Sequence, residues 1–180
     1  MSRFAARLRP GAVGCLRGTF HHTLRIHNGG YRLRSAPGSR ATIDGLVSFT
    51  RTSHDVVLAG LVLRSPNTPN VRINGTRITI RRSVITNGHT GICVSIGGGF
   101  ERYGLAHGVA LLRNRIHDCG RLPPTNHDHG VYVEGSVGSG TTSLRSLATS
   151  LSPGATAVAR IRPARVVWWR GWSSGSADIT

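Results

Sequence analysis

Short runs of alternating apolar and polar residues recur along the middle of the chain. One pattern, apolar-x-apolar-x₄-apolar, occurs three times; its second copy starts 22 residues after the first, and its third starts 31 residues after the second. The copies are Val56, Leu58 and Leu63; Ile78, Ile80 and Ile85; and Val109, Leu111 and Ile116. Alternation with a period of two residues predicts β-strands, and helical spacing is not sustained anywhere between residues 20 and 135.

A second short alternating segment follows each copy, at residues 71–73, 92–94 and 131–133. Turn signals such as Asn74-Gly75 and Asn87-Gly88 separate the segments. The extra residues before the third copy fit in a glycine-rich loop at 97–107. Four upstream segments are predicted to be strands of earlier turns, at residues 23–26, 31–34, 41–43 and 46–49.

One such unit cannot bury its own apolar face, whereas successive units stacked on one another can. Each β-branched residue then lies above its counterpart in the next turn. The sequence therefore predicts an all-β chain folded as a β-solenoid of few coils. A β-sandwich is the alternative, because it accounts for the alternation but not for the matched copies.

The chain changes in composition near residue 137. The first 136 residues contain all nine His, whereas the last 44 contain all three Trp and are rich in Ser, Thr, Gly and Ala. A segment of this kind has little apolar surface to bury. We expect three parts: an N-terminal lead-in at 1–19, coils at 20–136, and a low-complexity, poorly ordered tail at 137–180.

Two stretches resemble a known family. Residues 34–45 (RSAPGSRATIDG) are similar to the N-terminal coils of right-handed parallel β-helix repeat proteins of the pectate-lyase-like superfamily, and residues 113–120 (RNRIHDCG) with 127–133 (HDHGVYV) resemble a later coil. The resemblance covers about residues 11–136 and implies a single-stranded right-handed parallel β-helix, here as an N-terminal fragment with an off-pattern tail. It also implies a secreted family that binds or processes polysaccharides, as lyases, epimerases and hydrolases do.

The charge of the chain is strongly positive. All 23 basic residues are Arg, and only seven acids oppose them, which gives a net charge of +16. Without Lys, the chain cannot use a phosphate-loop lysine or Schiff-base chemistry. The charge favours polyanionic partners, although the use of Arg in place of Lys throughout is also typical of a coding bias. The start of the chain lacks the apolar core of a signal peptide, and no run is long enough for a membrane span. Localisation and oligomeric state stay open.

Three cysteines, Cys15, Cys93 and Cys119, are an odd and widely spaced set. They match no disulfide framework and no zinc pattern, so we expect buried thiols.

The densest polar cluster consists of His117, Asp118, His127, Asp128, His129 and Glu134. Three interpretations stay open: structural hydrogen bonds, sugar binding with acid/base chemistry, and divalent-metal binding, with no cofactor as the default. In the second, His127 or His129 is the base, Arg113 or Arg115 neutralises charge that develops on a uronate, and His117, Asp118, Asp128 and Glu134 contact substrate.

Other polar residues are predicted to have structural roles or to face solvent. His54-Asp55 is interpreted as a turn cap, and Arg77, Arg81 and Arg82 as a solvated strand face. Three functional classes are carried forward: a protein that binds or processes an anionic polysaccharide, an inactive structural solenoid, and a charge-driven binder of nucleic acid. The last is disfavoured, and no specific nucleic-acid partner is expected, because aromatics interleaved with Arg are not evident in the sequence of the body.

Overall fold

The fold was obtained as a computed structural model. It describes the chain except for residue 68 and residues 124–128, 136–143, 148–149, 152–155 and 162–180. His127, Asp128 and most of the predicted tail therefore lie outside the described residues.

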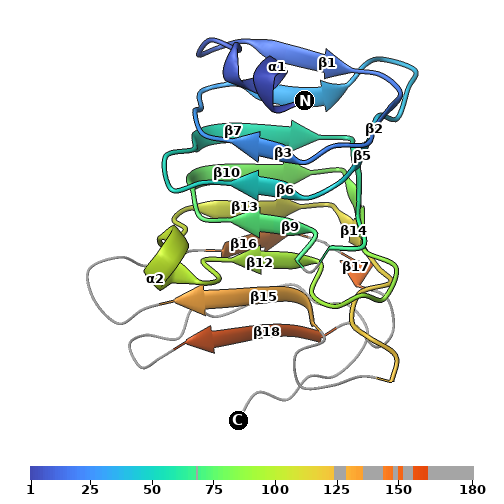
Figure 1. Ribbon diagram of the computed structural model, residues 1–180, viewed down its shortest axis with the longest axis vertical. Coiled ribbons are helices and arrows are strands. Elements are labelled where there is room, and N and C mark those ends of the chain that lie inside the picture. The colour runs from blue at the N-terminus through green and yellow to red at the C-terminus, as the bar shows by residue number, and fades with distance from the viewer. Residues whose placement is uncertain (68, 124–128, 136–143, 148–149, 152–155, 162–180) are drawn as a thin grey trace.

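Three parallel sheets wind around one apolar core (Figure 1). Sheet A consists of β1 (Val13–Leu16), β4 (Arg32–Ser35), β7 (His54–Ala59), β10 (Thr76–Arg81), β13 (Val109–Leu112) and β16 (Leu144–Leu147). Sheet B consists of β2 (Thr19–Phe20), β5 (Thr42–Asp44), β8 (Val62–Arg64), β11 (Val84–Thr86), β14 (Arg115–Ile116) and β17 (Ser150–Leu151). Sheet C consists of β3 (Leu24–Ile26), β6 (Val47–Phe49), β9 (Val71–Ile73), β12 (Val94–Ile96), β15 (His129–Gly135) and β18 (Thr156–Ile161).

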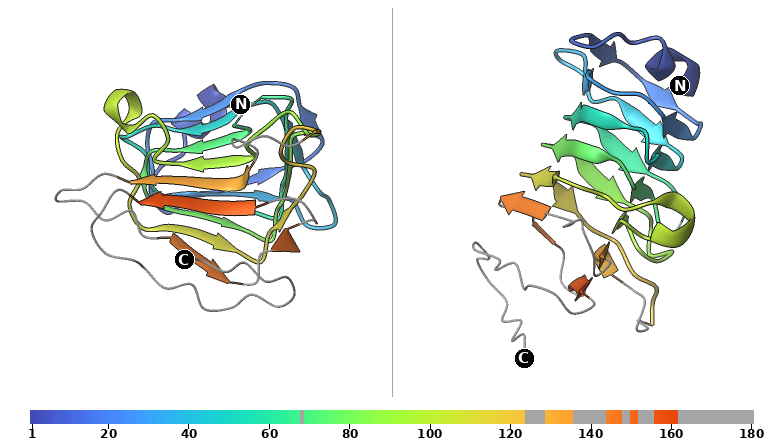
Figure 2. Two further views of the ribbon diagram at one scale, coloured as in Figure 1. Left: turned by 90° about the horizontal axis from the view of Figure 1, so that it is seen from below. Right: turned by 90° about the vertical axis from the view of Figure 1, so that its left-hand side faces the viewer.

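Each coil contributes one strand to each sheet, so the chain forms a β-solenoid and not a sandwich (Figure 2). The predicted vertical alignment is confirmed at the repeat positions. Ile80 pairs in register with Leu58 on one side and with Leu111 on the other, and Ile85 lies between Leu63 and Ile116. All five side chains are buried, because every coil places its inward residues on those of the next.

One register prediction was wrong. Residues 92–94 were expected beside residues 71–73, but Val94 pairs with Val71 and Ile96 with Ile73. Side chains two residues apart point to the same face of a strand, so alternation cannot distinguish a shift of two residues.

The cysteine prediction was also wrong. Cys93 and Cys119 form a disulfide with a Cα–Cα distance of 5.5 Å, and Cys15 is a free thiol that is exposed on β1. The disulfide links the residue before β12 to the segment after β14. The sequence spacing could not reveal this disulfide, because the two cysteines meet at a corner of the solenoid and do not occupy matching positions of stacked strands.

Among the described residues, only two short segments are helical. The helix α1 (Ser2–Ala6) lies at the N-terminal end, where Ser2 Oγ donates to Thr23 O and accepts the N–H of Arg25. The short helix α2 (Phe100–Tyr103) belongs to the predicted loop after β12. Strand β1 falls in the expected lead-in, and β16, β17 and β18 fall in the expected tail, where they continue the three sheets.

Candidate functional site

Two of the predicted site residues meet at the corner between sheets B and C. His117 Nδ1 donates to Asp118 Oδ2 at 2.8 Å, and His89 Nε2 lies 3.8 Å from the other oxygen of Asp118. The disulfide is adjacent, since the sulfur atoms of Cys93 and Cys119 both lie near His117 O. This corner is a compact hydrogen-bonded turn held by a covalent link.

The other predicted site residues that the structure describes do not join this pair. His129 begins β15 and Glu134 lies near its end, so the two are separated along the strand by about 15 Å. The carboxylate of Glu134 accepts the N–H of Gly99 at 2.8 Å. Arg115 points outward from sheet B, and Arg113 lies in the turn before it. His127 and Asp128 lie outside the described residues.

The described part of the chain contains no preformed metal site. No group of three or more His, Cys, Asp or Glu side chains there is positioned to hold a metal ion. The hydrogen-bonded corner at His117 is thus a pair of polar side chains with a third one nearby, not a coordination sphere.

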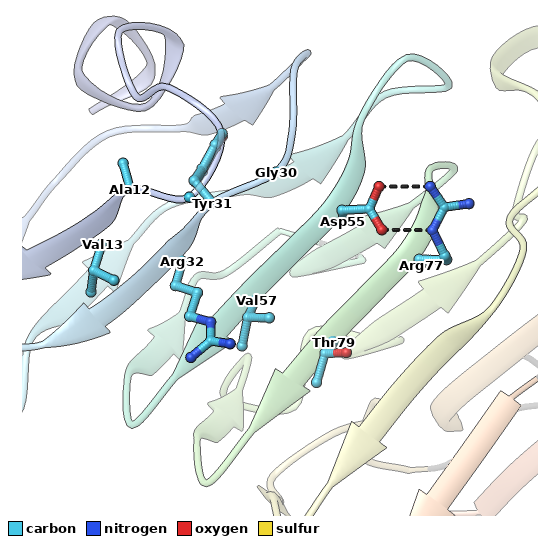
Figure 3. Close-up of a pocket in the computed structure, with 10 residues that line it drawn as sticks. Ala12, Val13, Gly30, Tyr31, Arg32, Asp55, Val57, Arg77 and Thr79 are labelled. Carbon is cyan, nitrogen blue, oxygen red and sulfur yellow. Dashed lines mark hydrogen bonds and ion pairs between the residues drawn. The ribbon is translucent and has the colours of Figure 1, made fainter.

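A groove of about 650 Å³ crosses the outer face of sheet A (Figure 3). It runs over β1, β4, β7 and β10 and contains both polar and apolar side chains. Its lining consists of Gly11, Ala12, Val13, Gly30, Tyr31, Arg32, Asp55, Val57, Arg77 and Thr79. Tyr31 is buried, and burial raises the pKa of its hydroxyl to about 12. The hydroxyl therefore stays neutral near pH 7, and it donates to Asn28 Oδ1 at 3.3 Å.

Asp55 and Arg77 lie at one end of the groove, and His54, which is outside the lining, completes a three-residue polar cluster. Arg77 donates from Nε and Nη2 to the two oxygens of Asp55, each at 2.6 Å, as Figure 3 shows. His54 Nδ1 lies 3.0 Å from Asp55 Oδ2. The hydrogen bonds from Arg77 first, and from His54 second, hold the pKa of Asp55 well below its ordinary value. Because the carboxylate can only accept, His54 Nδ1 is the donor, and in the neutral ring Nε2 is the nitrogen without a proton.

The local fold explains why these residues meet. Asp55 and Arg77 both adopt left-handed backbone conformations, with φ of 52° in each case. The 22-residue offset that aligns Val56 with Ile78 also places Asp55 beside Arg77. Asp118, next to His117, has a similar φ of 51°. Aspartate tolerates this conformation better than most residues, so both His-Asp pairs share the same local backbone feature.

Sequence reasoning missed this cluster by treating each coil separately. It interpreted His54-Asp55 as a turn cap and Arg77 as a solvated side chain, whereas the two coils combine them into one ion pair. The repeat length was the available signal, because it aligns every residue with the one 22 positions later in these two coils.

Arginines with no carboxylate partner extend the groove along sheet A. Register places Arg32 beside Val57, and Arg34 beside Ala59, which in turn lies beside Arg81. All three arginines are exposed, and among the described residues none of them forms an ion pair. Arg34 and Arg81 are two strand spacings apart, about 9.6 Å. The face therefore presents a cluster of guanidinium groups around small and apolar residues.

The Asp55–Arg77 pair predicts a pH response. In Arg77→Asn the guanidinium is lost while the left-handed backbone is still tolerated, so the pKa of Asp55 should return toward its ordinary value. The stabilisation from a depressed carboxyl pKa is present above the unfolded-state pKa and is lost as the pH falls through the folded-state pKa. As the pH falls through the acid range, the free energy of unfolding should hence decrease less in the variant than in wild type. NMR titration of the Asp55 carboxyl carbon measures the shift.

A matched control is Arg82→Asn, since Arg82 also has a positive φ of 50° and forms no ion pair within the described residues. It should leave the titration of Asp55 unchanged. If the titration midpoint of Asp55 were equally low in wild type and in Arg77→Asn, Arg77 would not be the cause of the low pKa of Asp55.

Comparison of the chain with protein-family models, with curated proteins and with solved structures finds no match. The function proposed below therefore depends on the fold and on the groove over sheet A. No helix in the described parts of the chain has the length and apolar character needed to cross a membrane.

Proposed function

We propose that this protein binds an anionic polysaccharide along the outer face of sheet A. The observation that carries the proposal is the groove with its adjoining Arg32, Arg34 and Arg81, which have no carboxylate partner among the described residues. Positively charged side chains that lie close together repel one another. A bound anion is attracted to all of them and reduces this repulsion. Guanidinium groups suit carboxylates because they donate two parallel hydrogen bonds.

The shape of the face supports an extended ligand. Parallel coils repeat the same backbone about every 4.8 Å, so polar groups recur along the solenoid axis as acidic groups recur along a polysaccharide. The sequence resemblance to polysaccharide-active β-helix proteins favours the same class of ligand. A uronate polymer, which carries a carboxylate on each sugar, is the simplest candidate.

The groove and the adjoining His54 together supply the groups that a processing reaction would need. His54 Nε2 is available as a base, Asp55 fixes the opposite ring nitrogen, and Arg77 fixes Asp55. Arg32 lines the same groove and could neutralise a substrate carboxylate. Binding is the primary proposal, and turnover of a uronate polymer by this cluster is its extension.

Calorimetric titration with polygalacturonate tests the binding. Replacing Arg32 and Arg34 together by Ser should weaken binding by roughly tenfold, since each exposed ion pair contributes up to about 1 kcal/mol. The control is the double variant Arg113→Ser and Arg115→Ser, which removes the same charge from the turn before sheet B and from sheet B itself. It should bind almost as well as wild type. Equal losses in the two variants, or equal binding of neutral dextran, would refute the proposal.

A further inference from the structure

The outer face of sheet C differs from that of sheet A. One register row crosses it through Arg25, Ser48, Arg72, Ser95 and Tyr132. Small serines thus alternate with long planar side chains. Ser48 and Ser95 are buried although their strand positions face outward, and the loop backbone at Gly98 lies against Ser95. Arg25, Arg72 and Tyr132 follow one another at about 9.6 Å, two strand spacings.

The loop after β12 adds a second aromatic side chain to this face. In Figure 1, α2 lies at one end of β9 and β12. Tyr103 places its ring 4.6 Å from the guanidinium carbon of Arg72 and 5.3 Å from that of Arg102. Both distances fall within the range of cation–π contacts. Glu134 accepts the N–H of Gly99 and so ties the base of the loop to β15.

The neighbouring coil contributes a stacked ring pair. His129 and Tyr132 lie with ring centroids 5.9 Å apart and planes inclined by 10°. A register shift between His129 and Val131 brings both rings to the same face of β15. Tyr132 is half-buried, so part of its ring remains accessible.

The sheet C platform is defined here as Arg25, Arg72, Arg102, Tyr103, His129 and Tyr132. It interleaves aromatic rings with arginines, a combination that the sequence did not reveal because the residues come from separate coils. Neither Arg25 nor Arg72 forms an ion pair with a described carboxylate. We propose that this platform binds single-stranded nucleic acid, with phosphates on the arginines and a base stacked at Tyr132.

The chemistry favours an unpaired strand over other polyanions. Aromatic rings beside cations bind single strands without sequence preference, because every base has a π-face and every linkage has a phosphate. A duplex hides its bases, and a uronate polymer gains from the arginines but offers no base to stack. The platform lies on a different sheet from the groove, so it adds a second binding face to the proposed polysaccharide site.

Fluorescence anisotropy with a labelled oligothymidylate tests the platform on the full chain. The single strand should bind more tightly than the oligothymidylate–oligoadenylate duplex of the same length. Tyr132→Leu should weaken single-strand binding by between about 5-fold and 100-fold, the range for stacking of one base. Tyr132→Phe keeps the ring and should bind within about twofold of wild type. Arg25→Ser should reduce the slope of log affinity against log salt by about 0.7.

Two controls separate this proposal from the polysaccharide site. The Arg32→Ser, Arg34→Ser variant should retain oligothymidylate binding near physiological salt, where charges on another sheet are screened beyond about 8 Å. Tyr132→Leu should retain polygalacturonate binding, which also shows that it folds. Wild-type affinity of Tyr132→Leu for oligothymidylate would overturn the platform. So would equal binding of the duplex; neither of these results bears on Arg32 and Arg34.

Discussion

Replacing Ile80 by Ala is expected to lower the free energy of unfolding by about 2–5 kcal/mol, the cost of removing a buried Ile side chain and leaving a cavity. Ile80 is fully buried, and it lies between Leu58 in the preceding coil and Leu111 in the following coil. Its loss therefore weakens two coil-to-coil interfaces at once. Urea denaturation followed by circular dichroism measures the effect.

The control for this variant is Thr79→Ala, one residue away on the outer face of the same strand. Its side chain is not part of the core, so its effect should stay within about 0.5 kcal/mol. If Thr79→Ala destabilised the chain as much as Ile80→Ala, the inward and outward assignments of β10 would be wrong.

Loss of the disulfide is expected to destabilise the chain by about 3 kcal/mol. Cys93 and Cys119 are 26 residues apart, and a cross-link of that span reduces the entropy of the unfolded chain by roughly this amount. The double variant Cys93→Ser and Cys119→Ser should accordingly melt at a lower temperature than wild type. The cross-link anchors the corner that carries His117 and Asp118, so the variant should also exchange amide hydrogens faster there.

Thiol titration provides the check on this prediction. Denatured, unreduced wild type should show one reactive thiol, that of Cys15, and Cys15→Ser should show none. Reducing agent should lower the melting temperature of wild type but not that of the double variant. Three reactive thiols in the unreduced wild type would contradict the pairing.

The sequence predicted the core of the fold well because burial acts on every inward position. Val56, Ile78 and Val109 recur at matched places since each must cover the one before it. Where burial imposes no constraint, prediction failed. Ile92 and Val94 are two residues apart, so by alternation either could have matched Val71, and in the structure Val94 does so.

The candidate sites were harder to predict because their contacts run between coils. Asp55 and Arg77 are unremarkable in sequence, and their meeting depends on the coil length. Tyr103 reaches Arg72 only because a loop folds back over sheet C. His117 and Asp118, neighbours in the chain, form the part of the predicted cluster that the structure brings together.

The parallel stacking of coils in register underlies all of these conclusions, and cysteine cross-linking tests it directly. In a Cys15→Ser background, cysteines at Thr79 and Ala110 should form a disulfide readily, because the two residues are register partners on β10 and β13 and adjacent strands bring their Cα atoms within bridging range. Cysteines at Thr79 and Leu112, two residues out of register, should cross-link much more slowly. Equal rates for the two pairs, or no cross-link at Thr79 and Ala110, would contradict the solenoid.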